Sequence, residues 1–332
     1  MVILIPQLPV SGRYSEYWPS LWQSKLQELG VECTIPYNAP SVKLDRSKPY
    51  NYFTNTLEAL DFELSALKML LRFVTSGDDK TILFLDGDFP GLSTPFVQVL
   101  KLVDPEVKCY SYVHAGSWCN GDVFSKSKGK KDLESSMFNT FDKVFVATEY
   151  HRNKIVDNFH ERLTLPYEEV YNFDKRIKIV GFPFYKEEFL EKGPFIHFNS
   201  KEGISITGRQ EQSKERLVSK IMKYFPKEKI HSGYVPSKDY YPLLSKTKII
   251  LSLKNEETFG LSLVEAMSLN CLPLVPNDFS YPEIVGKEEC LYKDFDDLIK
   301  KLGVLLGRKK SMKFNLSRWK KTIPRVIREM EI

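Results

Sequence analysis

The 332-residue sequence lacks several features that define common protein classes. It has no apolar run approaching the ~18 residues that a membrane-spanning helix needs. Its start, from Met1 to Pro6, has no basic segment ahead of an apolar one, so no secretory signal peptide is expected. The five cysteines show no C-x-x-C spacing, which argues against a zinc site and against a disulfide framework. These absences favour a cytoplasmic protein.

Several catalytic signatures are missing as well. The sequence contains no G-x-G-x-x-G, P-loop, G-x-S-x-G or H-E-x-x-H motif and no repeat with a period of 20–50 residues. What it does contain is an ordinary globular composition, with 42% hydrophobic and 27% charged residues. A chain of this length and composition is expected to form two domains.

The positive charge is concentrated rather than spread. The net charge is +5, yet residues 307–332 hold nine basic residues and two acidic ones, so the rest of the chain is slightly acidic. A second cluster, residues 125–131, holds four lysines in a segment expected to be a loop. Both are either solvated surface or contacts for a polyanion or an anionic membrane surface.

Short β-branched runs alternate with amphipathic stretches along the chain. The expected strands are 2–5, 31–35, 81–86, 107–113, 143–147, 176–180, 203–207, 230–232, 249–253 and 272–275. The expected helices include 17–29, 57–74, 214–224, 261–269 and 295–306. This alternation predicts parallel sheets covered on both faces. A polar stretch from Tyr185 to Gly203 separates two such α/β units, whose ligands should bind at the carboxyl ends of the strands.

The most informative segment is residues 255–267, where an expected strand is followed by an expected helix. The backbone N–H groups of Gly260, Leu261 and Ser262 at the helix start form a site suited to a phosphate. Glu257 precedes the helix and Glu265 lies in its second turn. Two carboxylates so placed can accept hydrogen bonds from two hydroxyl-bearing rings of one extended ligand, although an ordinary turn with two solvated glutamates has the same local pattern.

A second candidate site follows the expected strand 203–207. Gly208 and Arg209 come directly after it, and Lys214 stands at the start of the next helix. Arginine offers a fork for two oxygens and lysine a point charge, so together they suit a diphosphate.

Taken together, these motifs resemble the nucleotide-sugar site of retaining GT-B glycosyltransferases of family 4. The resemblance runs from Gly203 to about Ile284 and includes an E-x7-E pair at Glu257 and Glu265. The first half matches more loosely, at residues 112–114, 141–147 and 180–183. The resemblance implies two doubly wound Rossmann-like domains that face a central crevice. It places a first, acceptor-binding domain at 1–190, a nucleotide-sugar domain at 191–310, and a basic C-terminal helix at 311–332 that packs back on the first domain, as Trp319 suggests.

The resemblance also implies residue roles. Arg209 and Lys214 would hold the diphosphate, Glu257 the donor sugar and Glu265 the ribose hydroxyls. His114 would contact the sugar or the acceptor, and Gly12 would approach the donor from the loop after the first strand. Two departures stand out: the first loop has little glycine, and Asn270 stands where glycine is common.

The implied activity is transfer of a hexosyl group, such as glucose, from a UDP- or GDP-sugar to an acceptor hydroxyl, with retained configuration and without a metal or other cofactor. The expected acceptor is a glycan or small molecule, or a modified base of DNA or RNA. Trp118 with Lys126, Lys128 and Lys130 are candidate acceptor contacts, and the tail 307–332 is a further candidate for nucleic acid. Peripheral membrane contact stays open.

Two alternatives remain. Asp86 and Asp88 follow the expected strand that begins at residue 81, and an Asp-x-Asp at a strand end holds a metal in GT-A transferases, although Asp-Gly pairs are also frequent turns. The other alternative is a non-catalytic protein that binds a nucleotide-sugar.

Overall fold

The computed structural model describes residues 1–11, 13–43, 56–74, 81–88, 91–119, 125, 127–162, 173–190, 193–207, 212–233, 235–253 and 256–332. The chain divides into two compact units. Unit 1 comprises Met1–Gly181 and Thr322–Ile332, and unit 2 comprises Phe182–Lys321. Residues 182–190, which were predicted to lie in the first domain, therefore lie in unit 2. So do residues 311–321, which were predicted to be part of the C-terminal helix.

Unit 1 is built on a parallel sheet of six strands in the order β2-β1-β3-β4-β5-β6. The strands are β1 (Val2–Ile5), β2 (Cys33–Thr34), β3 (Thr81–Phe84), β4 (Lys108–Tyr112), β5 (Lys143–Val146) and β6 (Ile177–Ile179). The strand order reverses direction between β1 and β3, which pair in register from Val2 with Thr81 to Ile5 with Phe84. In open parallel sheets, ligands bind at the carboxyl ends of the strands at such a reversal.

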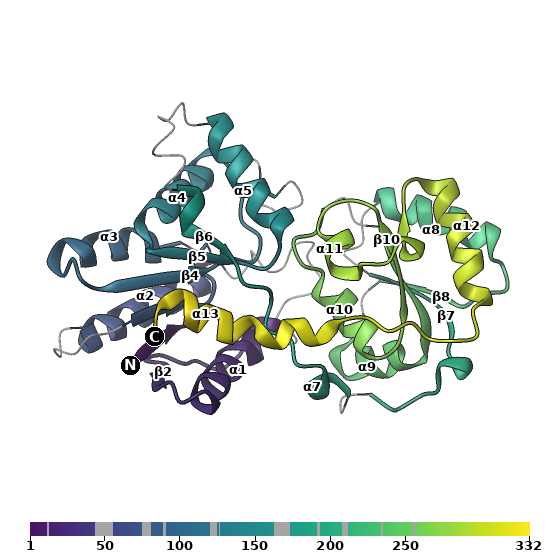
Figure 1. Ribbon diagram of the computed structural model, residues 1–332, viewed down its shortest axis with the longest axis horizontal. Coiled ribbons are helices and arrows are strands. Elements are labelled where there is room, and N and C mark those ends of the chain that lie inside the picture. The colour runs from purple at the N-terminus through teal and green to yellow at the C-terminus, as the bar shows by residue number, and fades with distance from the viewer. Residues whose placement is uncertain are drawn as a thin grey trace. The chain divides into compact units, whose positions relative to one another are not determined.

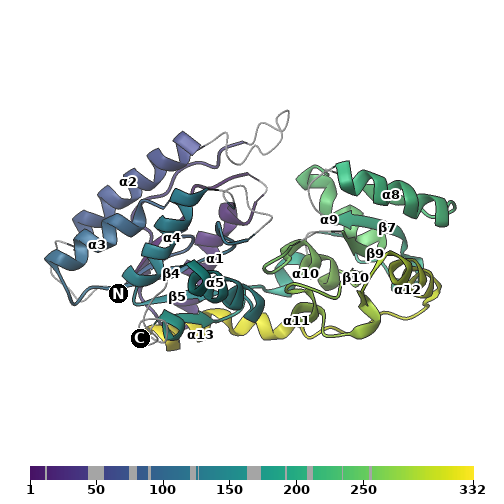
Figure 2. The same ribbon diagram turned by 90° about the horizontal axis from the view of Figure 1, so that it is seen from above.

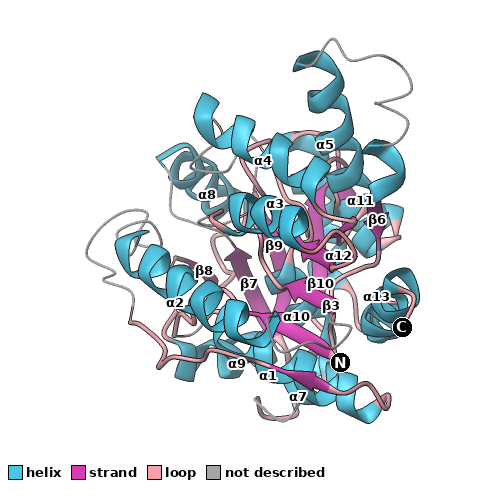
Figure 3. Cartoon of the chain, turned by 90° about the vertical axis from the view of Figure 1, so that its left-hand side faces the viewer, coloured by secondary structure: helices cyan, strands magenta, loops and turns pink. Residues whose placement is uncertain are grey.

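Helices cover both faces of this sheet (Figures 1 and 3). They are α1 (Tyr14–Glu28), α2 (Thr56–Val74), α3 (Ser93–Val103), α4 (Lys128–Thr140), α5 (Glu149–Arg162) and α13 (Thr322–Met330). Figure 1 shows α3, α4 and α5 on one face, with α1 and α13 on the other. Strands buried on both faces read as continuous apolar runs, as the fully buried sequence of β1 does.

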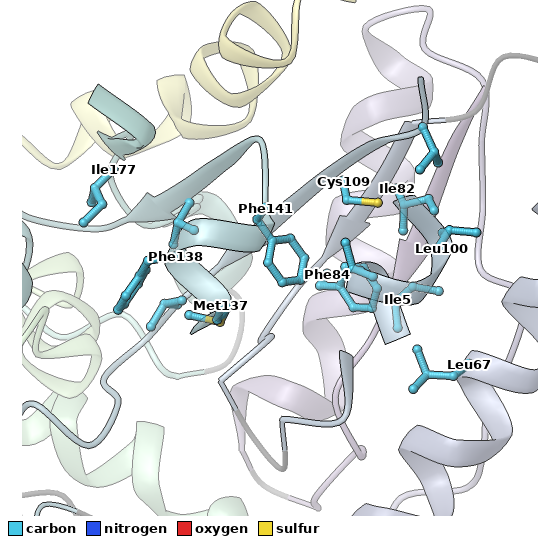
Figure 4. Packing of buried hydrophobic residues seen from close by; sticks show 14 of the residues in the cluster. Ile5, Leu67, Ile82, Phe84, Leu100, Cys109, Met137, Phe138, Phe141 and Ile177 are labelled. Atoms are coloured by element: carbon cyan, nitrogen blue, oxygen red, sulfur yellow. The ribbon is translucent and has the colours of Figure 1, made fainter. Parts of the chain in front are cut away.

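The core of unit 1 forms where α2, α3 and α4 pack on the sheet (Figure 4). Phe84 of β3 meets Phe141 edge to face, with ring centroids 5.3 Å apart. Leu67 of α2 and Leu100 of α3 belong to the same buried cluster. Each of these side chains removes enough apolar surface from water to contribute roughly 1.5–3 kcal/mol.

Unit 2 is built on a parallel sheet of five strands in the order β11-β10-β9-β7-β8. The strands are β7 (Glu202–Thr207), β8 (Ile230–Ser232), β9 (Thr247–Ser252), β10 (Leu272–Pro276) and β11 (Leu291–Tyr292). The helices are α7 (Lys186–Leu190), α8 (Gln212–Tyr224), α9 (Ser237–Lys246), α10 (Leu261–Ser268), α11 (Tyr281–Val285) and α12 (Phe295–Gly307), with short 3₁₀ turns at Phe198–Ser200, Glu288–Cys290 and Leu316–Lys321. Here the strand order reverses between β7 and β9.

The C-terminal segment is shared between the units. Helix α13 packs in unit 1, where the Tyr110 hydroxyl donates to the Met330 carbonyl at 3.2 Å and Lys143 pairs with Glu331 at 3.1 Å. Trp319 instead lies in unit 2, where its ring meets the Phe259 ring edge to face at 5.0 Å. Trp319, which had suggested packing on the first domain, thus belongs to unit 2.

The fold class predicted from the sequence is confirmed, because the chain forms two parallel α/β sheets. Every expected strand is present within a few residues of its predicted bounds. Among the described residues, no helix is long and apolar enough to cross a membrane.

Gly203 offers a stability test of unit 2. Its φ is +67°, and a Cβ there would lie 2.4 Å from the Lys229 carbonyl oxygen. Gly203→Ala is therefore expected to reduce the free energy of unfolding by about 2–3 kcal/mol, measured by urea denaturation. Gly129 in α4 has open space around its Cα, so Gly129→Ala should be neutral or slightly stabilising. Equal midpoints for the two variants would contradict the expectation.

Candidate functional site

The candidate donor site of unit 2 lies at the carboxyl ends of β7 and β9. These strands pair in register, with Ile206 opposite Leu251 and Thr207 opposite Ser252. Both strands therefore end at the same height, and the segments that follow them begin side by side. This is the point of strand-order reversal at which open α/β sheets bind ligands.

Gly260 forms the N-cap of α10, as the sequence predicted for the helix start. Its φ of 73° lies in the left-handed region, where only glycine is free of strain. A Cβ at this position would lie 3.3 Å from Cγ of Glu257. The first N–H groups of α10, on Leu261 and Ser262, have no acceptor inside the helix and carry the positive end of its dipole. The arrangement suits a phosphate group.

The loop that carries Glu257 is held at both ends. The backbone carbonyl of Glu257 accepts a hydrogen bond at 3.3 Å from the N–H of Ser280, which lies in the segment after β10. Two residues later, the Phe259 ring stacks on the Phe182 ring at 4.7 Å and 15°. These two contacts anchor the loop at the edge of the sheet. Glu257 itself is half-buried.

Glu265 is buried in the second turn of α10. Its two carboxylate oxygens accept hydrogen bonds from the Tyr240 and Tyr241 hydroxyls, at 2.9 and 3.0 Å. Burial and the Glu265 charge raise the pKa of Tyr240 well above its usual value, so this hydroxyl remains a donor. The two tyrosines hold the carboxylate in one orientation. Neither tyrosine had a predicted role, although both lie within the segment that resembles the nucleotide-sugar site.

Lys214 lies in the first turn of α8 and its side chain is largely buried. Its predicted companions, Gly208 and Arg209, lie outside the described residues, as does Gly12 of the first unit. Lys214 thus stands at the start of the helix that follows β7, as the sequence predicted.

A pocket of about 420 Å³ opens at the carboxyl ends of β9, β10 and β11. It is lined by Leu217, Leu253, Pro276, Asn277, Asp278, Phe279, Tyr292 and Lys293. Glu257 and Glu265 do not line it. No sequence motif pointed to this pocket, because its lining comes from four separate segments.

In unit 1, His114 follows β4 and lies half-buried against aromatic rings. Its ring centroid lies 4.3 Å from that of Tyr14, 4.2 Å from Trp18 and 5.0 Å from Tyr112. Burial lowers the pKa of His114 to about 3, against the opposing effect of Asp88. The imidazole is therefore neutral at pH 7. It can donate one hydrogen bond and accept another, but it carries no positive charge.

Asp86 and Asp88 lie after β3, at the strand-order reversal of unit 1. The Tyr14 hydroxyl donates to Asp86 at 2.9 Å. Burial, followed by the neighbouring Asp88, raises the pKa of Asp86 well above its usual value. The GT-A alternative is wrong, because the chain has two separate parallel sheets. Among the described residues, no group of three His, Cys, Asp or Glu side chains is placed to hold a metal ion.

Glu134 and Lys130 form a buried cluster with Asp88 that the sequence analysis did not foresee. Glu134 accepts hydrogen bonds from the Ser117 N–H at 2.8 and 2.9 Å and from its hydroxyl at 2.7 Å. Lys130 donates to the Asp88 carbonyl and lies 4.0 Å from Glu134. Burial and the charge of Asp88 raise the pKa of Glu134 to about 7.

Glu134→Gln is expected to flatten the dependence of stability on pH. The unfolded carboxyl ionises from about pH 4.5, but the folded one stays protonated to about pH 7, so the folded state loses relative stability between these values. This difference in pKa between the folded and unfolded states lowers the free energy of unfolding of the wild type by roughly 3 kcal/mol at pH 8. The Glu134→Gln variant has no such carboxyl and should not show this loss. Thermal unfolding between pH 4 and 8 measures it. Asp132→Asn, at an exposed position of the same helix, is the control, and equal slopes for all three proteins would contradict the assignment.

The lysine-rich segment 125–131 was expected to be a loop, but its residues from Lys128 onward are helical. Helix α4 begins at Lys128, and the Ser127 side chain accepts a hydrogen bond from the Lys130 N–H at 3.3 Å. Lys128 is exposed, Lys130 turns inward, and Lys126 lies outside the described residues. Trp118 is buried, with Lys131 Nζ 5.7 Å from its ring centroid.

Comparison with known proteins shows what part of unit 2 is similar to. Residues 203–313 match the family model of glycosyl transferases group 1. This segment is therefore similar to a glycosyl transferases group 1 domain. The matched segment covers β7 to α12 and includes Lys214, Glu257, Gly260 and Glu265.

A curated relative is the tRNA-queuosine alpha-mannosyltransferase of Drosophila melanogaster, which is 34% identical over 92 residues. The match spans 28% of this chain and 22% of the length of the fly protein.

Solved structures resemble the whole chain. They include an alpha,alpha-trehalose-phosphate synthase from Burkholderia vietnamiensis, with a TM-score of 0.62 and 11% identity over 99% of this chain and 98% of that one. The E. coli trehalose-6-phosphate protein bound with UDP-2-fluoro glucose has a TM-score of 0.61 and 12% identity over 99% and 95%. The sucrose-phosphate synthase of Thermosynechococcus elongatus has a TM-score of 0.58 and 13% identity over 99% and 93%. These similarities confirm the GT-B fold that the group 1 motifs implied.

Proposed function

We propose that the chain is a retaining glycosyltransferase that moves a hexosyl group from a UDP- or GDP-sugar to an acceptor hydroxyl. The observation that carries the proposal is the arrangement after β9 in the group 1 domain. Three residues follow one another there: Glu257, Gly260 and Glu265. Gly260 has a left-handed backbone conformation at the start of α10, and Glu265 accepts hydrogen bonds from two tyrosine hydroxyls. They offer one phosphate site between two carboxylates.

In the proposed mechanism, the donor diphosphate binds the N-terminus of α10 and the positive charges of Arg209 and Lys214. Glu257 accepts hydrogen bonds from the donor sugar, and Glu265 from the ribose. The acceptor hydroxyl attacks the anomeric carbon from the face that the diphosphate leaves, and the departing phosphate oxygen takes the proton. Catalysis then rests on positioning and on electrostatic stabilisation of the leaving group.

A panel of nucleotide-sugars tests the donor assignment. A ligand that binds only the folded state increases the free energy of unfolding, by about 2.7 kcal/mol when its concentration is 100 times its Kd. The midpoint of thermal unfolding rises as a result. We expect one UDP- or GDP-hexose to raise the midpoint in the wild type and Glu265→Ala to weaken that response. No shift with any member of the panel would overturn the proposal.

Donor turnover separates an enzyme from a nucleotide-sugar-binding protein without activity. The matching donor should release UDP or GDP in the presence of acceptor, in buffer with EDTA, because the proposed site balances the diphosphate charge with protein groups. Binding without any release of nucleotide would favour the non-catalytic alternative.

The acceptor is proposed to be a glycan, a small molecule or a modified nucleoside. The name of the fly relative, a tRNA-queuosine mannosyltransferase, supports a nucleoside of tRNA. Lys128 and the exposed lysines of 307–332, including Lys309, Lys310 and Lys313, would then contact phosphates. Transfer of radioactive sugar to tRNA, with binding that weakens steeply as salt rises, is the expected result for this acceptor. Transfer to a neutral glycan without salt dependence would exclude it.

A further inference from the structure

Helix α2 presents apolar side chains on two opposite faces. Its inner face, including Ala66, Leu67 and Leu70, belongs to the buried core of unit 1 (Figure 4). Its outer face carries Leu57, Leu64 and Leu71, whose exposed fractions are 80%, 57% and 49%. A helix that covers a single core normally keeps this face polar.

The three leucines form one stripe along the helix. They are spaced by seven residues, which is close to two helical turns, so they drift by only about 20° from one to the next. Leucines at this spacing form the seams along which two helices pack. On the neighbouring α3, which lies beside α2 in Figure 2, Val99, Leu102 and Val103 are also exposed.

The charges beside the stripe have opposite signs at its two ends. Glu58 and Asp61 are exposed in the N-terminal half of α2, and Lys68 and Arg72 are exposed in the C-terminal half. If two copies of α2 run antiparallel about an axis near Leu64, Leu57 of each copy meets Leu71 of the other. The same arrangement sets Asp61 opposite Lys68, whereas a parallel arrangement would set like charges against each other.

We propose that this stripe, Leu57, Leu64 and Leu71 of α2, is the interface of a homodimer with two-fold symmetry. The self-complementary charge pattern identifies a second copy of this chain as the occupant. A membrane surface is less well matched, because the flanking charges balance and offer no net attraction to anionic lipid.

Analytical ultracentrifugation of the full chain tests the interface. The wild type is expected to sediment as a dimer at micromolar concentrations. Leu64→Asp places two carboxylates on the symmetry axis and should raise the dimer dissociation constant at least 100-fold. Val304→Asp, at an exposed valine of α12 in unit 2, is the control and should leave the dimer intact. Circular dichroism verifies that both variants are folded.

A charge exchange tests the antiparallel register. Asp61→Lys should weaken the dimer by setting two lysines together, and so should Lys68→Asp, but the double variant should restore the wild-type dissociation constant. A cysteine at position 64 gives an independent readout. The native cysteines are all buried, so Leu64→Cys should form a disulfide between copies under mild oxidation.

A wild type that stays monomeric at 100 micromolar would overturn the proposal. So would binding to vesicles of anionic phospholipid that depends on Leu64, since that result would make the stripe a membrane contact. Full dissociation by Val304→Asp would also contradict it.

Discussion

Replacing Lys214 by alanine is expected to reduce sugar transfer by about 100- to 1,000-fold. Lys214 is a largely buried cation in the first turn of α8, which follows β7 at the strand-order reversal. In the proposed mechanism its charge stabilises the leaving diphosphate, and removal of one such group costs about 3–4 kcal/mol of transition-state stabilisation. Initial rates at saturating donor and acceptor measure the loss.

A matched control is available on the same helix. Lys223 is exposed in the last turn of α8, and Lys223→Ala should keep wild-type activity. Arg209→Ala and Glu257→Ala should show losses comparable to that of Lys214→Ala. Near-normal activity in all three variants would refute the donor site.

His114→Ala is expected to lower kcat by about 100-fold without shifting the pH profile. Burial holds the pKa of His114 near 3, so the imidazole is neutral across the range in which the enzyme would be assayed. A neutral imidazole can contribute a hydrogen bond in the transition state but cannot supply a positive charge that is lost as pH rises. The profile of kcat between pH 5 and 9 should therefore contain no inflection from this residue.

His197 is the control for this prediction, because it is exposed in unit 2 and its replacement by alanine should have no effect. An inflection near pH 6.5 that disappears in His114→Ala would show that His114 titrates in the working range, against the structural expectation. Unchanged kcat in His114→Ala would remove it from the reaction.

Most strands could be predicted because they are short, largely buried and separated by amphipathic stretches. β1, for example, is fully buried and spans Val2–Ile5 as predicted. β11 was not predicted, because its two residues, Leu291 and Tyr292, are too few to show a pattern. Helix α4 was also not predicted, since its first turn is rich in lysine and glycine and is capped by the Ser127 side chain.

The candidate donor residues were easier to predict from the sequence than the other candidate residues. Glu257, Gly260 and Glu265 lie within nine residues of one another, so a local pattern could reveal them. The carboxyl cluster of Glu134 and Asp88 with Lys130 joins segments far apart in the chain, and only packing brings them together. The outward leucine stripe of α2 was hidden for another reason, because apolar residues on both faces of a helix blur the periodicity that separates inside from outside.

The return of α13 to unit 1 orders the folding of the chain during synthesis. Ile323 and Val326 of α13 are fully buried, yet they follow all of unit 2 in the sequence. The ribosome therefore releases every residue of unit 2 before it releases the helix that covers unit 1. Until then, the apolar surface that α13 covers has no permanent partner, which makes this interval the one most exposed to aggregation or chaperone capture.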